Sequence, residues 1–413
     1  MLCPAHEVPS QLRMRASRHE SLRYRHSSAR VWLFALCLAC VAWGCQKRER
    51  GPDLESQSGD ESTHAEFGAL IARLSEPGGN FGRPAPISNE RNFTLPLPEL
   101  SQRANEGGVF VGVGPEQNLT FIAAANPTLA FVVDIRRDNM LLHLLFRSMF
   151  IEARTADEWL RLCLGRELPK RSNASQPEAP VPASTTAGGA EALIRNINSA
   201  VPNPQVHAGL LARTLTRMRD EWQVPLEAGD ESALARMLHA FFEHGLNLRD
   251  GRHKTSKPTF EALLRSTDSN GVERHFLADP NAFERVRQLE LAGRIVPLVG
   301  DFAGEKTFAG LAAHLNQQSL RVSAVYASNV EEFLSSESLP RWRRNLSGLP
   351  HSPDAVLIRT MRDRNELRLV WLWHTDLINA LDSSPRPDNS ADEHSPPSGT
   401  TAGQTQLANA HAQ

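Results

Sequence analysis

The chain has 413 residues, of which 40% are hydrophobic and 22% charged, and its formal net charge at pH 7 is -2. This composition is typical of a globular protein whose core is large enough to fold without disulfide bonds. The near-neutral charge excludes the broad basic surface of a nucleic-acid-binding protein, so no nucleic-acid partner is expected. Four of the five cysteines precede residue 46 and the fifth is Cys163, which excludes a disulfide framework.

The N-terminus has the pattern of a targeting segment. Residues 31–45 form a largely apolar run behind an arginine-rich stretch, and this run is short for a membrane span but typical of a signal sequence. It ends in Val41-Ala-Trp-Gly-Cys45, which resembles a bacterial lipobox, although Trp43 is atypical. We therefore predict a lipoprotein signal peptide over residues 1–45, lipidation of Cys45 and attachment to a membrane of the bacterial cell envelope. An uncleaved signal anchor is the alternative.

Three later segments are poor in large apolar residues. Residues 46–65 are charged and predict a flexible tether, while residues 169–190 and 381–413 are rich in Ser, Thr, Pro and Ala and predict a disordered insert and a disordered tail. The folded domain is expected over residues 66–380.

The first informative pattern after the tether is a strand, a glycine turn, a helix and a second strand. Residues 109–113 are apolar and lead into Gly112-Val-Gly114-Pro-Glu116, after which residues 117–125 have helical spacing. Residues 130–134 form a second apolar run that ends in Asp134, twenty residues after Gly114. This arrangement is typical of the nucleotide-binding half of a Rossmann-like sheet.

The remaining elements follow from apolar periodicity. Helices are predicted over residues 66–76, 97–103, 140–150, 157–164, 191–199, 207–222, 231–244, 259–266, 280–291, 306–317, 330–334 and 340–346. Strands are predicted over residues 294–301 and 321–326, and a closing hairpin over residues 355–360 and 367–373. The fold class is therefore α/β: a Rossmann-like, mostly parallel sheet with an antiparallel edge hairpin, interrupted by a helical insertion at about residues 138–292.

The glycine turn and the acid that follows it suit a ligand containing adenosine. Gly112 and Gly114 would let the backbone approach a ligand closely, and Asp134 is placed to accept hydrogen bonds from a ribose diol. The third glycine of the dinucleotide fingerprint is absent, and Glu116 lies where a pyrophosphate would bind. A carboxylate there favours a cationic ligand such as S-adenosylmethionine (SAM). A glycine-rich turn with a purely structural role is the alternative.

These motifs resemble the class I SAM-dependent methyltransferase fold over roughly residues 105–160 and 292–378. The resemblance implies that Gly112, Gly114, Glu116 and Asp134 hold the cofactor, and that Asp301 and Phe302 contact the adenine. More specifically, the motifs Gly-Val-Gly-Pro-Glu-Gln-Asn, Val-Asp-Ile-Arg-Arg-Asp-Asn and Gly-Asp-Phe resemble an uncharacterised bacterial lipoprotein family with such a core.

The resemblance also places Tyr326 and Asn329 on the substrate side of the site. Two features depart from the methyltransferase pattern, because no acid precedes the glycine turn and Asn329 is not followed by Pro-Pro. Methyl transfer depends mainly on placing the sulfonium and the nucleophile, so the pattern identifies no catalytic base. No metal site is expected, since His239 and His244 are five residues apart and cannot share one helix face as ligands.

Two functions remain open from the sequence. One is a membrane-anchored, SAM-binding methyltransferase-like protein with an unidentified substrate. The other is a non-catalytic binding or interaction protein of the envelope that retains the fold. Export would favour this second function, because SAM is made in the cytosol and an exported enzyme would lack a supply of it.

Overall fold

The computed structural model describes residues 58–79, 81–82, 86–103, 107–169, 189–250, 257–363 and 366–373, all within one compact unit. The predicted signal peptide with Cys45, residues 46–57 of the tether, residues 170–188 of the insert and the tail lie outside the described residues. Among the helices of the described part, none is long and apolar enough to cross a membrane.

A six-stranded sheet lies at the centre of the fold, with strand order β3-β2-β1-β4-β5-β6. Its strands are β1 (Val109–Gly112), β2 (Leu129–Asp134), β3 (Ile295–Val299), β4 (Val322–Ser328), β5 (His351–Asp363) and β6 (Glu366–Trp373). The first five run parallel to one another, and β6 pairs antiparallel with β5 at the edge. The predicted α/β class is confirmed, and the architecture is compatible with a Rossmann-like fold.

Burial explains why these segments form strands. Every residue of β1 and β3 is buried, and so are all residues of β2 except Leu129. Parallel strands covered on both faces are expected to be continuous apolar runs, in which Val and Ile also suit the pleated geometry. The sequence shows such runs at all three positions, which is why they were identifiable from it.

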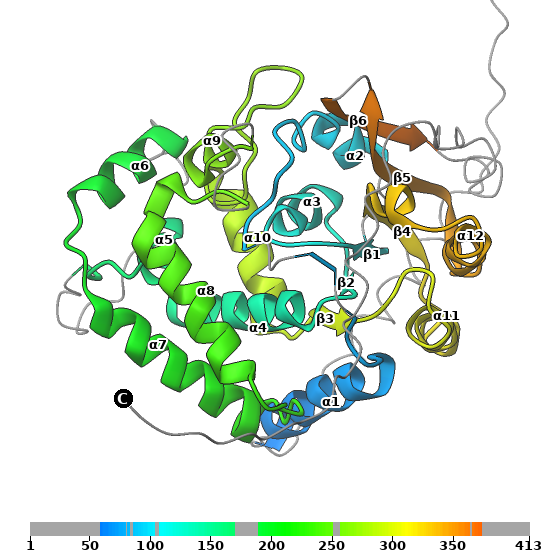
Figure 1. The fold of residues 1–413 in the computed structure, drawn as a ribbon, viewed down its shortest axis with the longest axis horizontal. Coiled ribbons are helices and arrows are strands. Elements are labelled where there is room, and N and C mark those ends of the chain that lie inside the picture. Colours follow the sequence, from blue (N-terminus) through cyan, green and yellow to red (C-terminus); the bar gives the residue numbers. More distant parts are fainter. Residues whose placement is uncertain are drawn as a thin grey trace, which may run out of the picture. The chain divides into compact units, whose positions relative to one another are not determined.

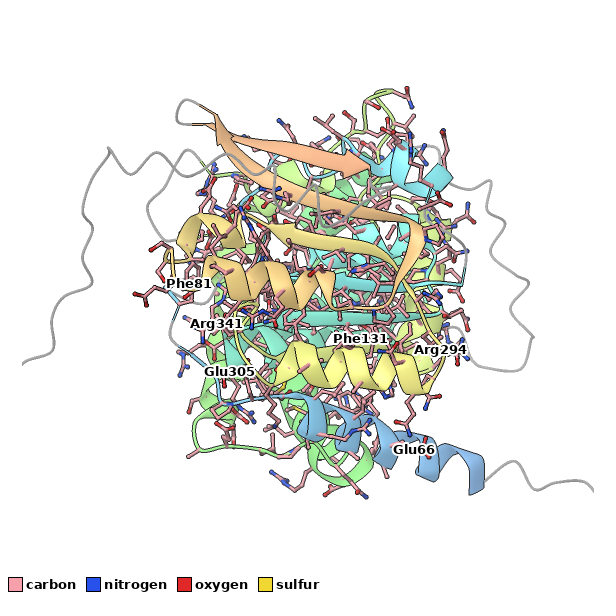
Figure 2. The ribbon with its side chains drawn as sticks, turned by 90° about the vertical axis from the view of Figure 1, so that its right-hand side faces the viewer. Glu66, Phe81, Phe131, Arg294, Glu305 and Arg341 are labelled. Atoms are coloured by element: carbon pink, nitrogen blue, oxygen red, sulfur yellow. The ribbon has the colours of Figure 1, made fainter. Side chains whose placement is uncertain are left out.

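Helices cover both faces of the sheet (Figure 1). On one face lie α3 (Gln117–Ala125), α4 (Arg137–Glu152) and α10 (Pro280–Leu291), of which α3 contacts β1 and β4 and α4 contacts β2 and β3. On the other face lie α11 (Thr307–Gln317) and α12 (Leu339–Ser347), which contact each other. Figure 2 views this second face, where Phe131 of β2 lies 6.2 Å from the ring of His314 in α11.

Helices fill the chain between β2 and β3. Besides α4 and α10 they are α5 (Ala156–Leu164), α6 (Gly189–Ser199), α7 (Pro204–Thr216), α8 (Asp230–His244) and α9 (Phe260–Leu264), with a π-helical turn η2 (Arg217–Glu221) and a 3-10 turn η3 (Gly245–Asn247). Aromatic rings join this layer to α4: Trp159 lies 5.6 Å from Phe150 and 5.4 Å from Phe276. Arg137, at the start of α4, forms an ion pair with Asp230 at the start of α8.

Several element boundaries differ from the sequence-based expectation, and the largest differences concern two helices. Helix α1 (Ser58–Leu74) begins eight residues earlier than expected, inside the predicted tether. The extension has a physical reason, because a nucleated helix adds further turns at little free-energy cost. The helix expected over residues 207–222 begins at Pro204 and changes to the π-helical turn η2 at Arg217. Helix α2 (Leu97–Arg103) and a 3-10 turn η4 (Val330–Phe333) complete the fold.

Candidate functional site

The strand order places the topological switch point, where an open α/β sheet is expected to have its ligand crevice, between β1 and β4. After β1 the chain crosses through α3 to β2, whereas after β4 it crosses through α12 to β5 on the opposite side. The segments that leave these two neighbouring strands therefore diverge, and in open α/β sheets ligands bind at this point, outside the carboxyl ends of the strands. The glycine turn that follows β1 lies at this point.

The chain's own side chains fill the space that the two glycines leave. Asn118 Nδ2 donates to the carbonyl oxygens of Val113, Gly114 and Pro115 at 2.9–3.0 Å. A Cβ at Gly112 would lie 2.0 Å from Asn118 Oδ1, and one at Gly114, where φ is +89°, would lie 3.1 Å from Gln117 Nε2. Packing alone thus requires glycine at both positions, and their predicted role in holding a cofactor remains a prediction.

Glu116 is buried beneath an adjacent segment of the chain. It forms the N-cap of α3, is 1% exposed, and accepts hydrogen bonds from the Ser88 backbone N–H at 3.0 Å and 2.9 Å, one to each carboxyl oxygen. Burial raises the pKa of Glu116 to about 8, against the lowering effect of the Ser88 hydrogen bonds, and the negative charge of Asp250 adds to the rise. Glu116 is therefore mainly protonated at neutral pH.

The turn is also supported from below by a buried histidine. His143 Nε2 lies 3.0 Å from the Gly114 carbonyl oxygen, so this nitrogen carries the proton and donates it. Burial lowers the pKa of His143 to about 4, which keeps the ring neutral. Sequence reasoning missed this residue because a histidine on an apolar helix face has no distinguishing pattern.

Asp134 lies at the end of β2, where it was predicted, but its carboxylate already has partners. Asp134 Oδ1 accepts from the backbone N–H and from Nε of Arg136, both at 2.9 Å, and Oδ2 accepts from an Arg136 NH2 group at 2.8 Å. A carboxylate offers about four lone-pair directions, so about one on Oδ2 is left for a ligand hydroxyl. A ribose diol would share Asp134 with Arg136.

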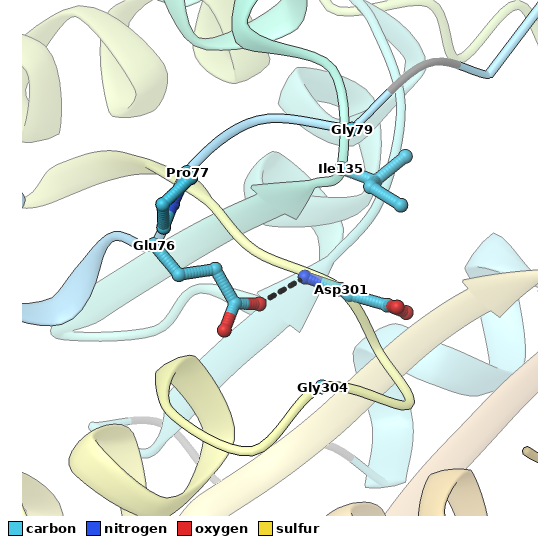
Figure 3. Close-up of a pocket in the computed structure, with 6 residues that line it drawn as sticks. All are labelled: Glu76, Pro77, Gly79, Ile135, Asp301 and Gly304. Carbon is cyan, nitrogen blue, oxygen red and sulfur yellow. Dashed lines mark hydrogen bonds between the residues drawn. The ribbon is translucent and has the colours of Figure 1, made fainter.

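A solvent-open pocket of about 290 Å³ lies between the loops that follow β2 and β3 (Figure 3). Its lining residues are Glu76, Pro77, Gly79, Ile135, Asp301 and Gly304. Glu76 Oε1 accepts from the Asp301 backbone N–H at 2.6 Å, and the Asp301 carboxylate accepts from the Ala303 N–H at 2.8 Å. The structure therefore brings the predicted Asp301 next to Ile135, the residue that follows Asp134.

Phe302 does not line this pocket. Its side chain is 3% exposed and packs 4.7 Å from the ring of Phe308, at the start of α11. The assignment of Phe302 to an adenine contact is therefore not supported by its position, because the apolar ring is held in the core beneath α11. Asp301, one residue earlier, faces the pocket instead.

The substrate-side candidates occupy different environments. Tyr326 is fully buried on β4, packs 4.5 Å from the ring of Phe121, and its hydroxyl accepts from Gln117 Nε2 at 3.3 Å. Asn329 is half-buried beyond the end of β4, and its Nδ2 donates to Glu332 at 3.1 Å. The two side chains therefore face different partners.

A buried carboxyl lies beside Tyr326, in the segment Ser88-Asn89-Glu90, which from the sequence is either a cover over the site or a plain loop. Glu90 is 6% exposed and accepts from Ser328 Oγ at 2.7 Å. Burial raises the pKa of Glu90, while the Ser328 hydrogen bond and the nearby hydroxyls of Tyr326 and Thr360 act to lower it. The sequence places Glu90 in a Pro- and Gly-rich stretch but does not show its partners, which lie far away along the chain. Within the described residues, no group of three or more His, Cys, Asp or Glu side chains could hold a metal ion.

Comparison with known families gives one match. The sequence model of the family described as Domain of unknown function (DUF7790) matches residues 85–172 and 248–395, which together are more than half of the chain. The matched residues include Glu116, Asp134 and Asp301, whereas Glu76, Pro77 and Gly79 of the pocket precede the match. The segment between the two matched ranges covers α6, α7 and α8. No curated protein matches the chain, and neither a methyltransferase nor a lipoprotein family is identified. The chain therefore belongs to the family described as Domain of unknown function (DUF7790).

Proposed function

We propose that this protein binds S-adenosylmethionine at the carboxyl edge of the sheet and has a methyltransferase-type core anchored to a membrane. The observation that carries this proposal is the pocket between the ends of β2 and β3. It joins an apolar side chain, Ile135, to a hydrogen-bond acceptor, Asp301, directly beside Asp134. The ring of an adenine could pack against Ile135 while its amino group donates to Asp301. The ribose would then lie against the remaining lone pair of Asp134.

The charges at this edge favour a cationic ligand over a phosphorylated one. Asp134 is 2% exposed, and Asp138 and Asp250 also act electrostatically on Arg136. Three carboxylates around one guanidinium repel a pyrophosphate, and they suit the sulfonium and ammonium groups of SAM. The antiparallel strand β6 beside β5 also supports a methyltransferase-type sheet over an all-parallel dinucleotide-binding one.

Titration of the full-length chain with SAM by calorimetry tests the binding proposal. We expect saturable binding that the Asp134→Asn variant weakens at least about tenfold, because a hydrogen bond to a charged acceptor contributes about 1.5–3 kcal/mol. Asp220→Asn is the matched control, since Asp220 is exposed on η2 in the helical insertion. Absence of heat at millimolar SAM, with a folded protein, would contradict the proposal.

A specific observation favours the second function, a non-catalytic binding or interaction protein. Tyr326 is fully buried and Ser88 and Glu90 are buried beside it, so the Tyr326 hydroxyl does not face solvent. SAM binding without methyl transfer to any added acceptor would select this function, whereas turnover would exclude it.

Membrane attachment is proposed to depend on Cys45, which lies outside the described residues. We expect the Cys45→Ser variant to move from the membrane fraction to the soluble fraction in the native bacterial host, because lipidation requires the thiol. Cys40→Ser, five residues earlier in the same apolar run, is the control and should stay in the membrane fraction. Equal membrane retention of both variants would rule out a lipid anchor at Cys45.

A further inference from the structure

A short segment covers the switch point between β1 and β4. It comprises residues 87–90 and is called the strap here. Ile87 is fully buried and Ser88 is 1% exposed, although neither belongs to a helix or a strand. The Ser88 N–H bonds to Glu116 at the start of α3, and the Glu90 carboxyl bonds to Ser328 at the end of β4. The strap therefore reaches across the switch point and covers the glycine turn.

Each hydrogen bond that joins the strap to another described segment involves a side chain of at least one partner. Its partners are the Glu116 carboxyl, the Asp250 carboxylate, which accepts from Asn89 Nδ2 at 3.1 Å, and the Ser328 hydroxyl. Within the described residues, no backbone-to-backbone hydrogen bond joins the strap to another segment. Opening it would break these contacts and expose Ile87, but it would leave every strand pairing of the sheet intact. Segments held in this way open locally at a lower free energy than the sheet unfolds.

We infer that the strap is a locally opening lid over the glycine turn, held closed by the Glu116 and Glu90 carboxyls (the latch), and that the part of a ligand that contacts this turn enters through the open form of the strap. Only the identity of that ligand rests on the proposed function. The closed strap occupies the edge that any ligand contacting the turn would need, so ligand and strap exclude each other there.

The latch is sensitive to pH in a defined direction. Opening hydrates Glu116, so its pKa falls from about 8 towards the ordinary value of 4.5, and the closed form binds the proton more tightly. The closed form is therefore favoured at low pH, opening increases as the pH rises from about 5 towards 8, and it levels off above 8. Glu90 acts in the same direction because burial raises its pKa as well.

The charged and titratable groups around the latch come from several elements. Glu116 interacts with Asp250, which raises its pKa, and with the thiol of Cys163 on α5, whose own pKa burial raises well above the ordinary value. Glu90 interacts with Tyr326 on β4 and with the charge of Lys257, which lowers its pKa. For both carboxyls the effect of burial outweighs these interactions.

Hydrogen exchange of the full-length chain, followed by mass spectrometry of peptides covering the strap, tests this lid. We expect the strap amides to be less protected than those of β1 at every pH. After correction for intrinsic exchange, their protection should fall by up to about tenfold per pH unit between pH 5.5 and 7.5. Glu116→Gln should reduce this slope. Asn92→Ala, an exposed change just beyond the strap, should leave it unaltered. Strap protection equal to that of β1, or a slope that Glu116→Gln does not change, would overturn the lid.

SAM titration of two strap variants tests the route of entry. Asn89→Ala removes the bond to Asp250, and Ser328→Gly removes the hydroxyl at a position where φ is +48°, which glycine tolerates. Each change should raise the open fraction, and so lower the dissociation constant for SAM, about fivefold. Faster strap exchange without tighter SAM binding would overturn the entry route. If SAM binds neither wild type nor variants while the strap still opens locally, the cofactor assignment fails and the lid stands.

Discussion

The Gly112→Ala variant is expected to lose about 3 kcal/mol of unfolding free energy in the absence of any ligand. The added Cβ would lie 2.0 Å from Asn118 Oδ1 and 2.6 Å from an atom of the Phe110 ring. Asn118 would have to leave the turn, and its three side-chain hydrogen bonds to backbone carbonyl oxygens would be lost, although His143 would still donate to the Gly114 carbonyl. Overpacking of a core typically costs about 1–3 kcal/mol, and each buried group left without a partner adds to that loss.

Denaturant unfolding measures this loss, and Gly209→Ala provides the control. At Gly209 on α7 a Cβ would meet only the far end of the Arg213 side chain, so the helix should gain up to about 1 kcal/mol from the better helix former. The comparison also separates two reasons for glycine at position 112. A variant that keeps wild-type stability but no longer binds SAM would show that Gly112 serves the ligand rather than Asn118.

The Arg147→Ala variant is expected to lose about 2–5 kcal/mol of unfolding free energy, because it removes a buried side chain that packs against two aromatic rings. Arg147 on α4 is 2% exposed, and its guanidinium carbon lies 4.3 Å from the ring centroid of Phe67 and 5.0 Å from that of Trp222. Glu290 on α10 is also buried and interacts electrostatically with Arg147. This cluster joins α1 and η2 to the helices that cover the sheet. Arg147→Met keeps the apolar stem and should lose less.

The pH dependence of this loss tests the charge coupling. Burial raises the pKa of Glu290 to about 8, and Arg147 lowers it. The stability that Glu290 contributes is therefore complete below pH 4.5 and is lost as the pH rises through about 8. Without Arg147 the pKa of Glu290 rises further, so Arg147→Met should lose more stability at pH 9 than at pH 6. The difference should vanish in a Glu290→Gln background. Equal losses at both pH values in the single variant would show that the two charges are not coupled.

The sequence predicts most elements of this fold because their signals are local. Strands β1, β2 and β3 are continuous apolar runs. The helix over residues 280–291 has the predicted bounds because Asp279 caps it and Pro280 begins it. The closing hairpin is present as β5 and β6, although β5 begins at His351, four residues before the expected strand. Such boundary shifts arise because pairing with β4 extends β5 beyond its apolar core.

The candidate site was predictable only in part. The chain alone places Asp134 at the end of a strand and Asp301 after another, and parallel pairing brings the two strand ends together. The chain alone does not show that Phe302 turns into the core, because both orientations suit a residue at a strand end. The chain alone also does not show that Arg136 donates hydrogen bonds to the Asp134 carboxylate, since an arginine near an acid in the sequence can equally be a solvated charge.

The amino-acid sequence by itself therefore determines the α/β class, the order of the strands and helices along the chain, and the acids at the strand ends. These follow from apolar periodicity and capping, which act over a few residues. Only the tertiary structure decides whether the carboxyl edge is open. The strap meets Glu116 and Ser328 across separations of 28 and 238 residues, and contacts at such separations leave no periodic trace in the chain. These contacts form when the sheet brings the ends of β1 and β4 together. The sequence suggests that the glycine turn is open to a ligand, whereas in the structure the strap covers it.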